Sequence, residues 1–308
     1  MIFHSTPKMM KTRKLVLFTC LLLSGTLVFG QDYAFKVLIN KGSNELKSGD
    51  GWQPVKTGAS LKASDELKLV ENAYVGLVHA TGKPMELKLA GNYKVSDLAA
   101  KVGSSASVLN KYTDFILSNN SAESKKNTLS ATGAVHRGAE GYAIQVLLPD
   151  NQYSGVFNNV IDVNWEGTSA PGPFVVTLRN MFEDELLKFE TPETHYRVDL
   201  TDAKLAKENA FLIEVRAKND AKQASKQYMV KRLSPADREN VKKSQGAIAG
   251  EVNDQTAINK LFWAGFYEEN RLLIDAMAAY EDAIRLAPDV AFYKEAYEDF
   301  LLRQAIRR

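Results

Sequence analysis

The stretch "AINKLFWAGFYEENRLLIDAMAAYEDAIRLAPD", residues 257–289, carries small and aromatic residues at helical spacing and ends near a proline. Apolar residues that return every three or four positions predict two helices separated by a short turn. Its spaced small and aromatic residues are Trp263, Ala264 and Tyr267 on the first helix, and Ala276, Tyr280 and Ala283 on the second. Pro288 is expected to stop the second helix, because its ring cannot continue the hydrogen-bond ladder.

This spacing resembles the tetratricopeptide repeat, in which small residues let two antiparallel helices approach closely while aromatic residues fill the gap. The resemblance covers residues 257–290. It departs from the family at Arg271, where the turn often has glycine, and Asn270 is expected to supply the left-handed conformation instead. Repeats of this type usually need about three neighbours to bury their apolar faces. These helices must therefore pack on the rest of the chain, on themselves or on another chain.

The whole tail, residues 234–308, is predicted to be helical. Ser234 is expected to cap a helix that begins at Pro235, with Asp237 near the positive end of the helix dipole. The segment "FYKEAYEDFLLRQ" matches the repeat poorly and predicts a capping helix over 291–306. Two interpretations stay open, a protein-docking module and a plain helical hairpin that completes the fold. For docking, the candidate protein-binding residues are Trp263, Tyr267, Tyr280, Tyr293 and Tyr297.

Residues 138–233 alternate with period two in seven short runs separated by turn residues. This pattern is typical of an immunoglobulin-like or fibronectin-like β-sandwich. Trp165 shares a strand face with Ile161 and Val163 and is expected in the core. The segment has no cysteine pair, which excludes an antibody-type domain.

Residues 31–98 contain short alternating runs such as "FKVLI" and "ELKLV", which predict a small antiparallel β-domain with Trp52 in its core. The segment "GASLKASDELKL", followed by "AYVGL" and "LAGNYKV", resembles the FecR-like periplasmic domain of bacteria. Ser64 stands where that family often has glycine. No counterpart of the sigma-regulating segment of FecR proteins is recognised, so the resemblance implies a periplasmic β-domain and not iron signalling.

Residues 99–137 are interpreted as a helix followed by a flexible linker. "SVLNKYTDFIL" places Val108, Tyr112, Phe115 and Ile116 at helical spacing, whereas "SNNSAESKKNTLSATG" loses all periodicity.

Residues 1–30 predict a cleaved signal peptide. The basic "KTRK" precedes an apolar run of fifteen residues, Leu15 to Phe29, and Gly30 follows. This run is shorter than the roughly twenty residues that span a bilayer. An uncleaved anchor and lipid attachment at Cys20 are the alternatives, although "LFTC" has threonine where such sites have a small residue.

Removal of this peptide changes the charge of the protein. It takes four of the 39 Lys and Arg residues and none of the 37 Asp and Glu residues, so the formal charge becomes −2 instead of +2. No basic stripe for nucleic acid is evident. Cys20 is the only cysteine, so the mature chain can form no disulfide or thiolate metal site. We expect export to the periplasm, with secretion or outer-membrane association as alternatives, and no integral membrane segment in the mature chain.

The sequence shows no catalytic motif. His79, His136 and His195 are isolated from one another, and no nucleophile elbow, phosphate loop or dinucleotide fingerprint is present. The densest carboxylate cluster is expected to be a solvated loop rather than a glycosidase pair, and it comprises Glu183, Asp184, Glu185 and Glu190. We therefore expect neither a cofactor, a metal nor an enzymatic activity.

Together these patterns predict a multidomain β plus α fold similar in arrangement to periplasmic proteins of Bacteroidetes-type bacteria. The expected function is a protein-protein interaction scaffold or sensor component that binds another envelope protein through its C-terminal helices. The alternative is a carbohydrate- or peptidoglycan-binding module, and a hydrolase with scattered catalytic residues is a third hypothesis. The candidate saccharide-stacking rings are Tyr33, Trp52, Tyr74 and Tyr93.

Overall fold

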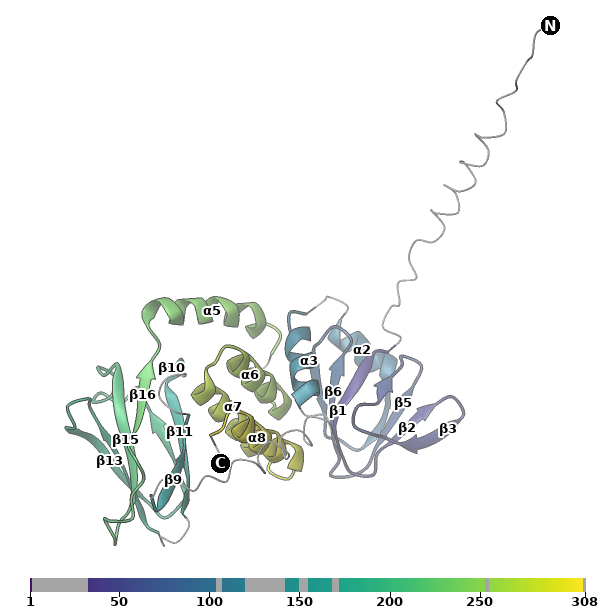
Figure 1. Ribbon diagram of the computed structural model, residues 1–308. Helices are drawn as coiled ribbons and strands as arrows, with labels where there is room; N and C mark the ends of the chain where they lie inside the picture. The colour runs from purple at the N-terminus through teal and green to yellow at the C-terminus, as the bar shows by residue number, and fades with distance from the viewer. Residues whose placement is uncertain are drawn as a thin grey trace. The chain divides into compact units, whose positions relative to one another are not determined.

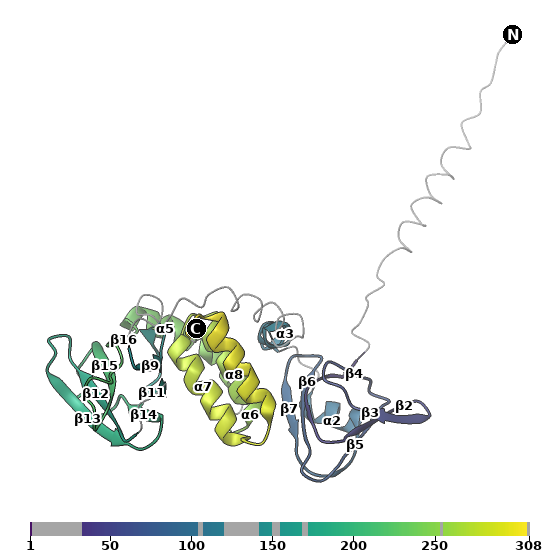
Figure 2. The same cartoon turned by 60° about the horizontal axis from the view of Figure 1, so that its bottom comes forward.

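The computed structural model describes residues 1, 33–103, 107–119, 142–149, 155–167, 172–252 and 255–306. In these residues several small sheets come first and a bundle of four helices follows, which confirms the predicted β plus α fold (Figures 1 and 2). Apart from Met1, the expected signal peptide with Cys20 lies outside the described residues, as do most of the linker and His136. Among the described helices, none combines the length and the apolar character that a membrane crossing requires.

Two four-stranded antiparallel sheets build the first β-domain. The sheet of order β4-β1-β6-β7 comprises β1 (Phe35–Lys41), β4 (Ser60–Leu61), β6 (Tyr74–His79) and β7 (Pro84–Leu87). The sheet of order β3-β2-β5-β8 comprises β2 (Glu45–Ser48), β3 (Gly51–Pro54), β5 (Glu66–Leu69) and β8 (Gly91–Lys94). Alternate residues such as Phe35, Leu67 and Leu77 form one core, as the period-two pattern predicts. Helix α2 (Val95–Val102) adds Val95 and Leu98 to this core, so the helix crosses the expected boundary at residue 98.

Trp52 does not fill the core of this domain, and that expectation was wrong. It pairs with Lys47 across β2 and β3, whereas the buried Leu46 pairs with Gln53. Because neighbouring residues of a strand point to opposite faces, Trp52 lies on the outer face with Lys47. Its side chain is 40% exposed.

Strand β1 serves two cores, because its pairing with β6 shifts register between Val37 and Ile39. Such a bulge lets consecutive residues leave the strict alternation. Val37 belongs to the core of the first β-domain, while Leu38 and Ile39 belong to the apolar cluster of the C-terminal helices. The first β-domain and the helices therefore share a buried surface.

The second β-domain is a sandwich of a five-stranded and a three-stranded sheet. The first has the order β10-β16-β15-β12-β13, with β10 (Gly155–Val156), β12 (Phe174–Arg179), β13 (Glu185–Thr191), β15 (Ala210–Ala217) and β16 (Tyr228–Arg232). The second has the order β14-β11-β9, with β9 (Ile144–Leu147), β11 (Val160–Gly167) and β14 (His195–Asp199). All seven predicted strands are present, and the two-residue β10 is an additional strand that pairs in parallel with β16.

The core of this sandwich forms as the alternation predicts. Ile161, Val163 and Trp165 are all buried, and the Trp165 ring meets Phe174 edge to face with centroids 5.4 Å apart. This arrangement confirms a β-sandwich, with two sheets around one apolar core.

Four helices follow the sandwich: α5 (Pro235–Ala249), α6 (Ala257–Glu269), α7 (Leu273–Leu286) and α8 (Ala291–Arg303). The Ser234 side chain accepts a hydrogen bond from the Asp237 backbone N–H at 3.2 Å and Pro235 is the first helical residue, as predicted. Helix α7 ends two residues before Pro288, which agrees with the expected stop.

The turn between α6 and α7 differs from the prediction. Arg271, with φ of +60°, adopts the left-handed conformation, and Asn270, with φ of −88°, does not. The Asn270 side chain instead donates to the Phe266 carbonyl at 2.7 Å. The N–H of Leu272 reaches the Tyr267 carbonyl at 2.8 Å, which completes a Schellman motif around Arg271. The backbone hydrogen bonds, rather than side-chain preference, decide which residue turns.

The helix expected in the connector is α3 (Asn110–Asn119), and it packs on α6. Tyr112 and Ile116 are buried against the C-terminal helices, and Phe115 is partly buried there. Val108 precedes the helix and is exposed.

Candidate binding surface

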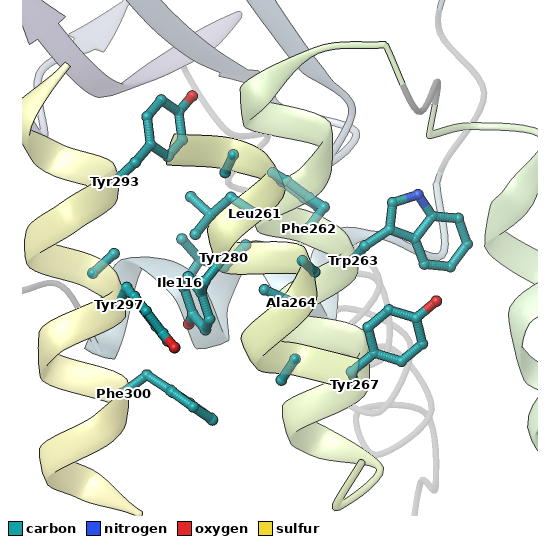
Figure 3. Packing of buried hydrophobic residues seen from close by; sticks show 14 of the residues in the cluster. Ile116, Leu261, Phe262, Trp263, Ala264, Tyr267, Tyr280, Tyr293, Tyr297 and Phe300 are labelled. Carbon is teal, nitrogen blue, oxygen red and sulfur yellow. The ribbon is translucent and has the colours of Figure 1, made fainter. Parts of the chain in front are cut away.

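The five aromatic residues expected to bind a partner lie inside the chain. None of them exposes more than 7% of its surface, and all belong to one apolar cluster built by α3, α5, α6, α7 and α8. Trp263 and Tyr267 project from the same side of α6 and stack with ring centroids 6.0 Å apart (Figure 3). Tyr280 of α7 stacks on Tyr297 of α8 at 5.7 Å. These rings hold the helices to one another and are not presented at the surface.

Two of the five rings also reach the β-domains. Tyr293 meets Tyr74 of β6 edge to face with centroids 6.0 Å apart, and their hydroxyl groups are hydrogen-bonded. Tyr267 lies 6.4 Å from the ring of Phe157, which follows β10 in the sandwich. The apolar faces of the helical tail are therefore covered by the protein's own β-domains.

Glu86 of β7 anchors the first β-domain to α6. Its Oε1 accepts hydrogen bonds from the Tyr74 hydroxyl at 2.6 Å and from the backbone N–H of Ile258 at 2.8 Å. Lys88 pairs with the other oxygen at 2.7 Å. Burial, then the neighbouring Tyr293 and Glu86, raise the pKa of Tyr74, so its hydroxyl stays a donor. The N-terminus of α6 thus receives a carboxylate where the helix dipole favours negative charge.

Asp275 of α7 anchors the sandwich in a similar way. Its side chain is fully buried and accepts the backbone N–H groups of Phe157 at 2.9 Å and Asn158 at 2.7 Å. Burial raises the pKa of Asp275 to about 6, although both backbone hydrogen bonds favour the ionised form. The two N–H groups lie in the chain between β10 and β11, outside both sheets.

A second group of polar contacts joins α7 to β11 and β14. Arg197 lies 3.3 Å from Asp162 and 3.1 Å from Asp282. Asn164 donates to Glu281 at 3.2 Å. Burial raises the pKa of Asp162, and burial followed by the charge of Asp162 raises the pKa of Glu281. These groups pair across the junction, and we assign them a structural role.

The described histidines do not converge. His79 hydrogen-bonds Thr81 at 2.8 Å, and burial followed by the charge of Lys83 lowers its pKa. His195 lies on β14, in the other β-domain. Within the part of the chain that the structure describes, no three His, Cys, Asp or Glu side chains are grouped to hold a metal ion.

The acidic cluster lies at the β12–β13 hairpin and is solvent-exposed, as expected. Glu183, Asp184 and Glu185 are exposed, and Glu190 pairs with Lys218 at 2.6 Å. The apolar pair beside these acids was not predicted from the sequence. Phe182 is 87% exposed and Met181 is 48% exposed at the tip of the hairpin. The sequence does contain a signal for it, because the two apolar residues stand between the turn-forming Asn180 and the acids 183–185.

The Asn180 side chain makes three hydrogen bonds within this tip. Its Oδ1 accepts the backbone N–H groups of Phe182 and Asp184, each at 2.9 Å. Its Nδ2 donates to the Asp184 carboxylate at 2.9 Å. The apolar pair is therefore presented outward by an ordered turn. We define the hairpin surface as residues 181–185.

The four rings considered for saccharide binding have different surroundings. Tyr74 is buried, and Tyr93 is half-buried with its hydroxyl donating to the Leu89 carbonyl at 2.7 Å. Tyr33 is half-buried, with the Lys36 ammonium 5.1 Å from its ring centroid. Trp52 alone among them is exposed, with the Lys68 ammonium 5.7 Å from its ring centroid.

Comparison with known proteins gives no assignment. No protein-family model matches the chain, and no curated protein is significantly similar to it. The function is therefore inferred from the geometry.

Proposed function

We propose that this chain is a non-enzymatic, exported protein of the bacterial envelope that acts as an interaction scaffold or sensor component and binds another envelope protein. The hairpin surface supports this proposal. Leaving Phe182 in water forgoes about 1.5–3 kcal/mol that its burial would provide. A large aromatic side chain held outward on an ordered turn is typical of a residue that becomes buried in a complex.

This proposal changes the expected binding element but not the class of function. The C-terminal helices support the β-domains internally, and the hairpin carries two exposed apolar side chains, Met181 and Phe182. Three adjacent acids, Glu183 to Glu185, follow Phe182 in the hairpin. The partner surface that fits them is an apolar pocket with lysine or arginine residues at its rim. Export rests on the pattern of residues 1–30, and the FecR-like and tetratricopeptide-like resemblances favour a periplasmic location.

The experiment places a photocrosslinking phenylalanine analogue at position 182 in cells of the source organism, identifies the adduct, and measures the affinity of the purified pair. Phe182→Ala is expected to raise Kd at least about tenfold, roughly 1.4 kcal/mol. Leu89→Ala is the matched control, because Leu89 is also apolar and is 76% exposed, against 87% for Phe182, but lies in the first β-domain. Its Kd should stay unchanged. Absence of a discrete adduct, or equal Kd values for both variants, would contradict the proposal.

Saccharide binding is the second candidate, because Trp52 is exposed on a sheet face that also bears Lys47, Lys68 and Asn92. An aromatic ring beside hydrogen-bonding side chains is suited to stack on a sugar ring. Binding to a saccharide array or to isolated peptidoglycan should disappear in Trp52→Ala and persist in Phe182→Ala. Equal binding by both variants would exclude the Trp52 face.

A further inference from the structure

Three acidic side chains lie along the junction between α7 and the sandwich: Asp275 is fully buried, and Asp162 and Glu281 are half-buried. Asp275 is fully buried under the chain that joins β10 to β11. Glu281, two turns further along α7, receives the Asn164 amide of β11, and Asp162 of the same strand receives Arg197. The contacts of Asp275 and Glu281 are absent if α7 separates from the sandwich, whereas Asp162 loses its cover by α7 and keeps Arg197 of the neighbouring strand.

We propose that this junction is a proton-linked clasp, in which α7 closes on the sandwich with uptake of protons and loosens as the pH rises. The proposal concerns the protein's own regulation and does not depend on the hairpin surface. It rests on the burial of three carboxylates of two separate elements in one interface, since an ionised carboxylate loses hydration when the interface closes.

The surroundings decide how far each carboxylate is neutralised. Charged and titratable groups from the helices and from β14 face these three carboxylates. They are Arg238 of α5, Lys260 of α6, Asp282 and Arg285 of α7, Tyr297 of α8, and His195 and Arg197 of β14. Arg197 and Lys260 both pair with Asp282, at 3.1 and 3.3 Å, so part of their charge is already compensated. Asp275 accepts only neutral N–H groups, with Arg238 as the nearby cation.

The direction of the effect follows from the closed and open states. In the open state each carboxylate is solvated and titrates near its ordinary pKa of about 4. In the closed state burial raises the pKa of Asp275 to about 6, and burial also raises the pKa values of Asp162 and Glu281. The closed state therefore binds more protons. Its stability relative to the open state falls as the pH rises from about 4 through the pKa values that the carboxylates have in the closed state. For Asp275 alone, the opening constant is expected to rise about tenfold between pH 5 and pH 7.

Opening at this junction need not unfold the sandwich. The sandwich has a core of its own, in which Trp165, Val176 and Phe211 are buried. Apolar contacts of the junction, including Ile274 against the sandwich core, do not titrate and keep the closed state populated at neutral pH. The pH then changes the frequency of opening without changing the fold.

Hydrogen exchange of the Phe157 and Asn158 amides measures this opening directly, because both amides donate to Asp275. After correction for the intrinsic exchange rate, their protection in the full chain should fall about tenfold or more from pH 5 to pH 7. Amides of β12, in the middle of the sandwich, should keep their protection. A loss of protection that includes β12 would show general destabilisation and would overturn the proposal, as would protection that is constant with pH.

Two variants separate titration from packing. Asp275→Asn has no proton to release and keeps only one of the two acceptor oxygens, so protection at Phe157 and Asn158 should fall at every pH while its pH dependence flattens. Glu281→Gln, on the half-buried side of the junction, should fold normally and reduce the slope by a smaller amount. Slopes equal to that of the unchanged protein in both variants would overturn the proposal.

Discussion

Gly76 lies where β6 meets α6, and the structure leaves little room there for a side chain. A Cβ at this position would come within 3.2 Å of Ile258 and of Ile39, both of which are buried. Gly76→Ala is therefore expected to lower the free energy of unfolding by about 1–3 kcal/mol, because two packed side chains must shift. Urea denaturation measures the loss.

Gly51 provides the control for this substitution. It is also a strand glycine, but a Cβ there would meet nothing within 4 Å. Gly51→Ala should change the unfolding free energy little or raise it slightly, since alanine restricts the unfolded chain. Equal losses in the two variants would show that close packing at Gly76 is not the cause.

Individual residues also show where the sequence was insufficient. Trp52 was predicted to lie in the core, but Leu46 of the paired strand β2 faces inward and Trp52 faces outward. Hydrophobicity favoured the wrong face for Trp52, because a large ring is usually needed in a small core. The exposure of Phe182 was not predicted for a related reason. Burial depends on the residues that surround a side chain in space, and a side chain at a hairpin tip has few such neighbours.

At the scale of elements, α5 depends on its cap more than the other helices do. Ile248 is its only fully buried residue, so packing contributes little to its stability. Ser234→Ala removes the acceptor for the Asp237 N–H and is expected to cost about 0.5–2 kcal/mol, with faster hydrogen exchange in the first turns of α5. Ser244→Ala, in the exposed middle of the same helix, should be neutral or slightly stabilising. Similar exchange in both variants would contradict a capping role for Ser234.

Most elements could be predicted because they carry a repeated signal. The seven longer strands of the sandwich and the helices from α6 to α8 each repeat their apolar period, whereas α5 was predicted from its N-terminal cap. The two-residue β10 cannot show a period, and it is held by pairing with β16, whose sequence is distant. The left-handed residue of the α6–α7 turn was misplaced because two backbone hydrogen bonds, and not the preference of asparagine, fix it at Arg271.

At the scale of the molecule, the sequence indicated the apolar stripes of the C-terminal helices but not which part of the chain packs against them. A stripe of alanine and aromatic residues fits a partner protein and a neighbouring domain equally well. Here Leu38, Tyr74, Leu147 and Phe157 of the β-domains join the helical cluster. This connection also explains why removal of residues 234–308 would be a poor test of partner binding, since it would expose apolar surface on both β-domains.

Ile274 of α7 links the sandwich to the rest of the chain, because it is buried within the sandwich core while its neighbours in α7 face the helical cluster. Ile274→Ala should weaken this link, with a total loss of about 2–5 kcal/mol. Calorimetry is expected to show one main unfolding transition in the unchanged protein and a separate sandwich transition in the variant. Ile284→Ala alters the same helix where it contacts only the helical cluster, so it should lower the transition temperature without dividing the transition. A single transition in Ile274→Ala would mean that the polar contacts of Asp275 and Glu281 are sufficient to keep the sandwich and helices cooperative.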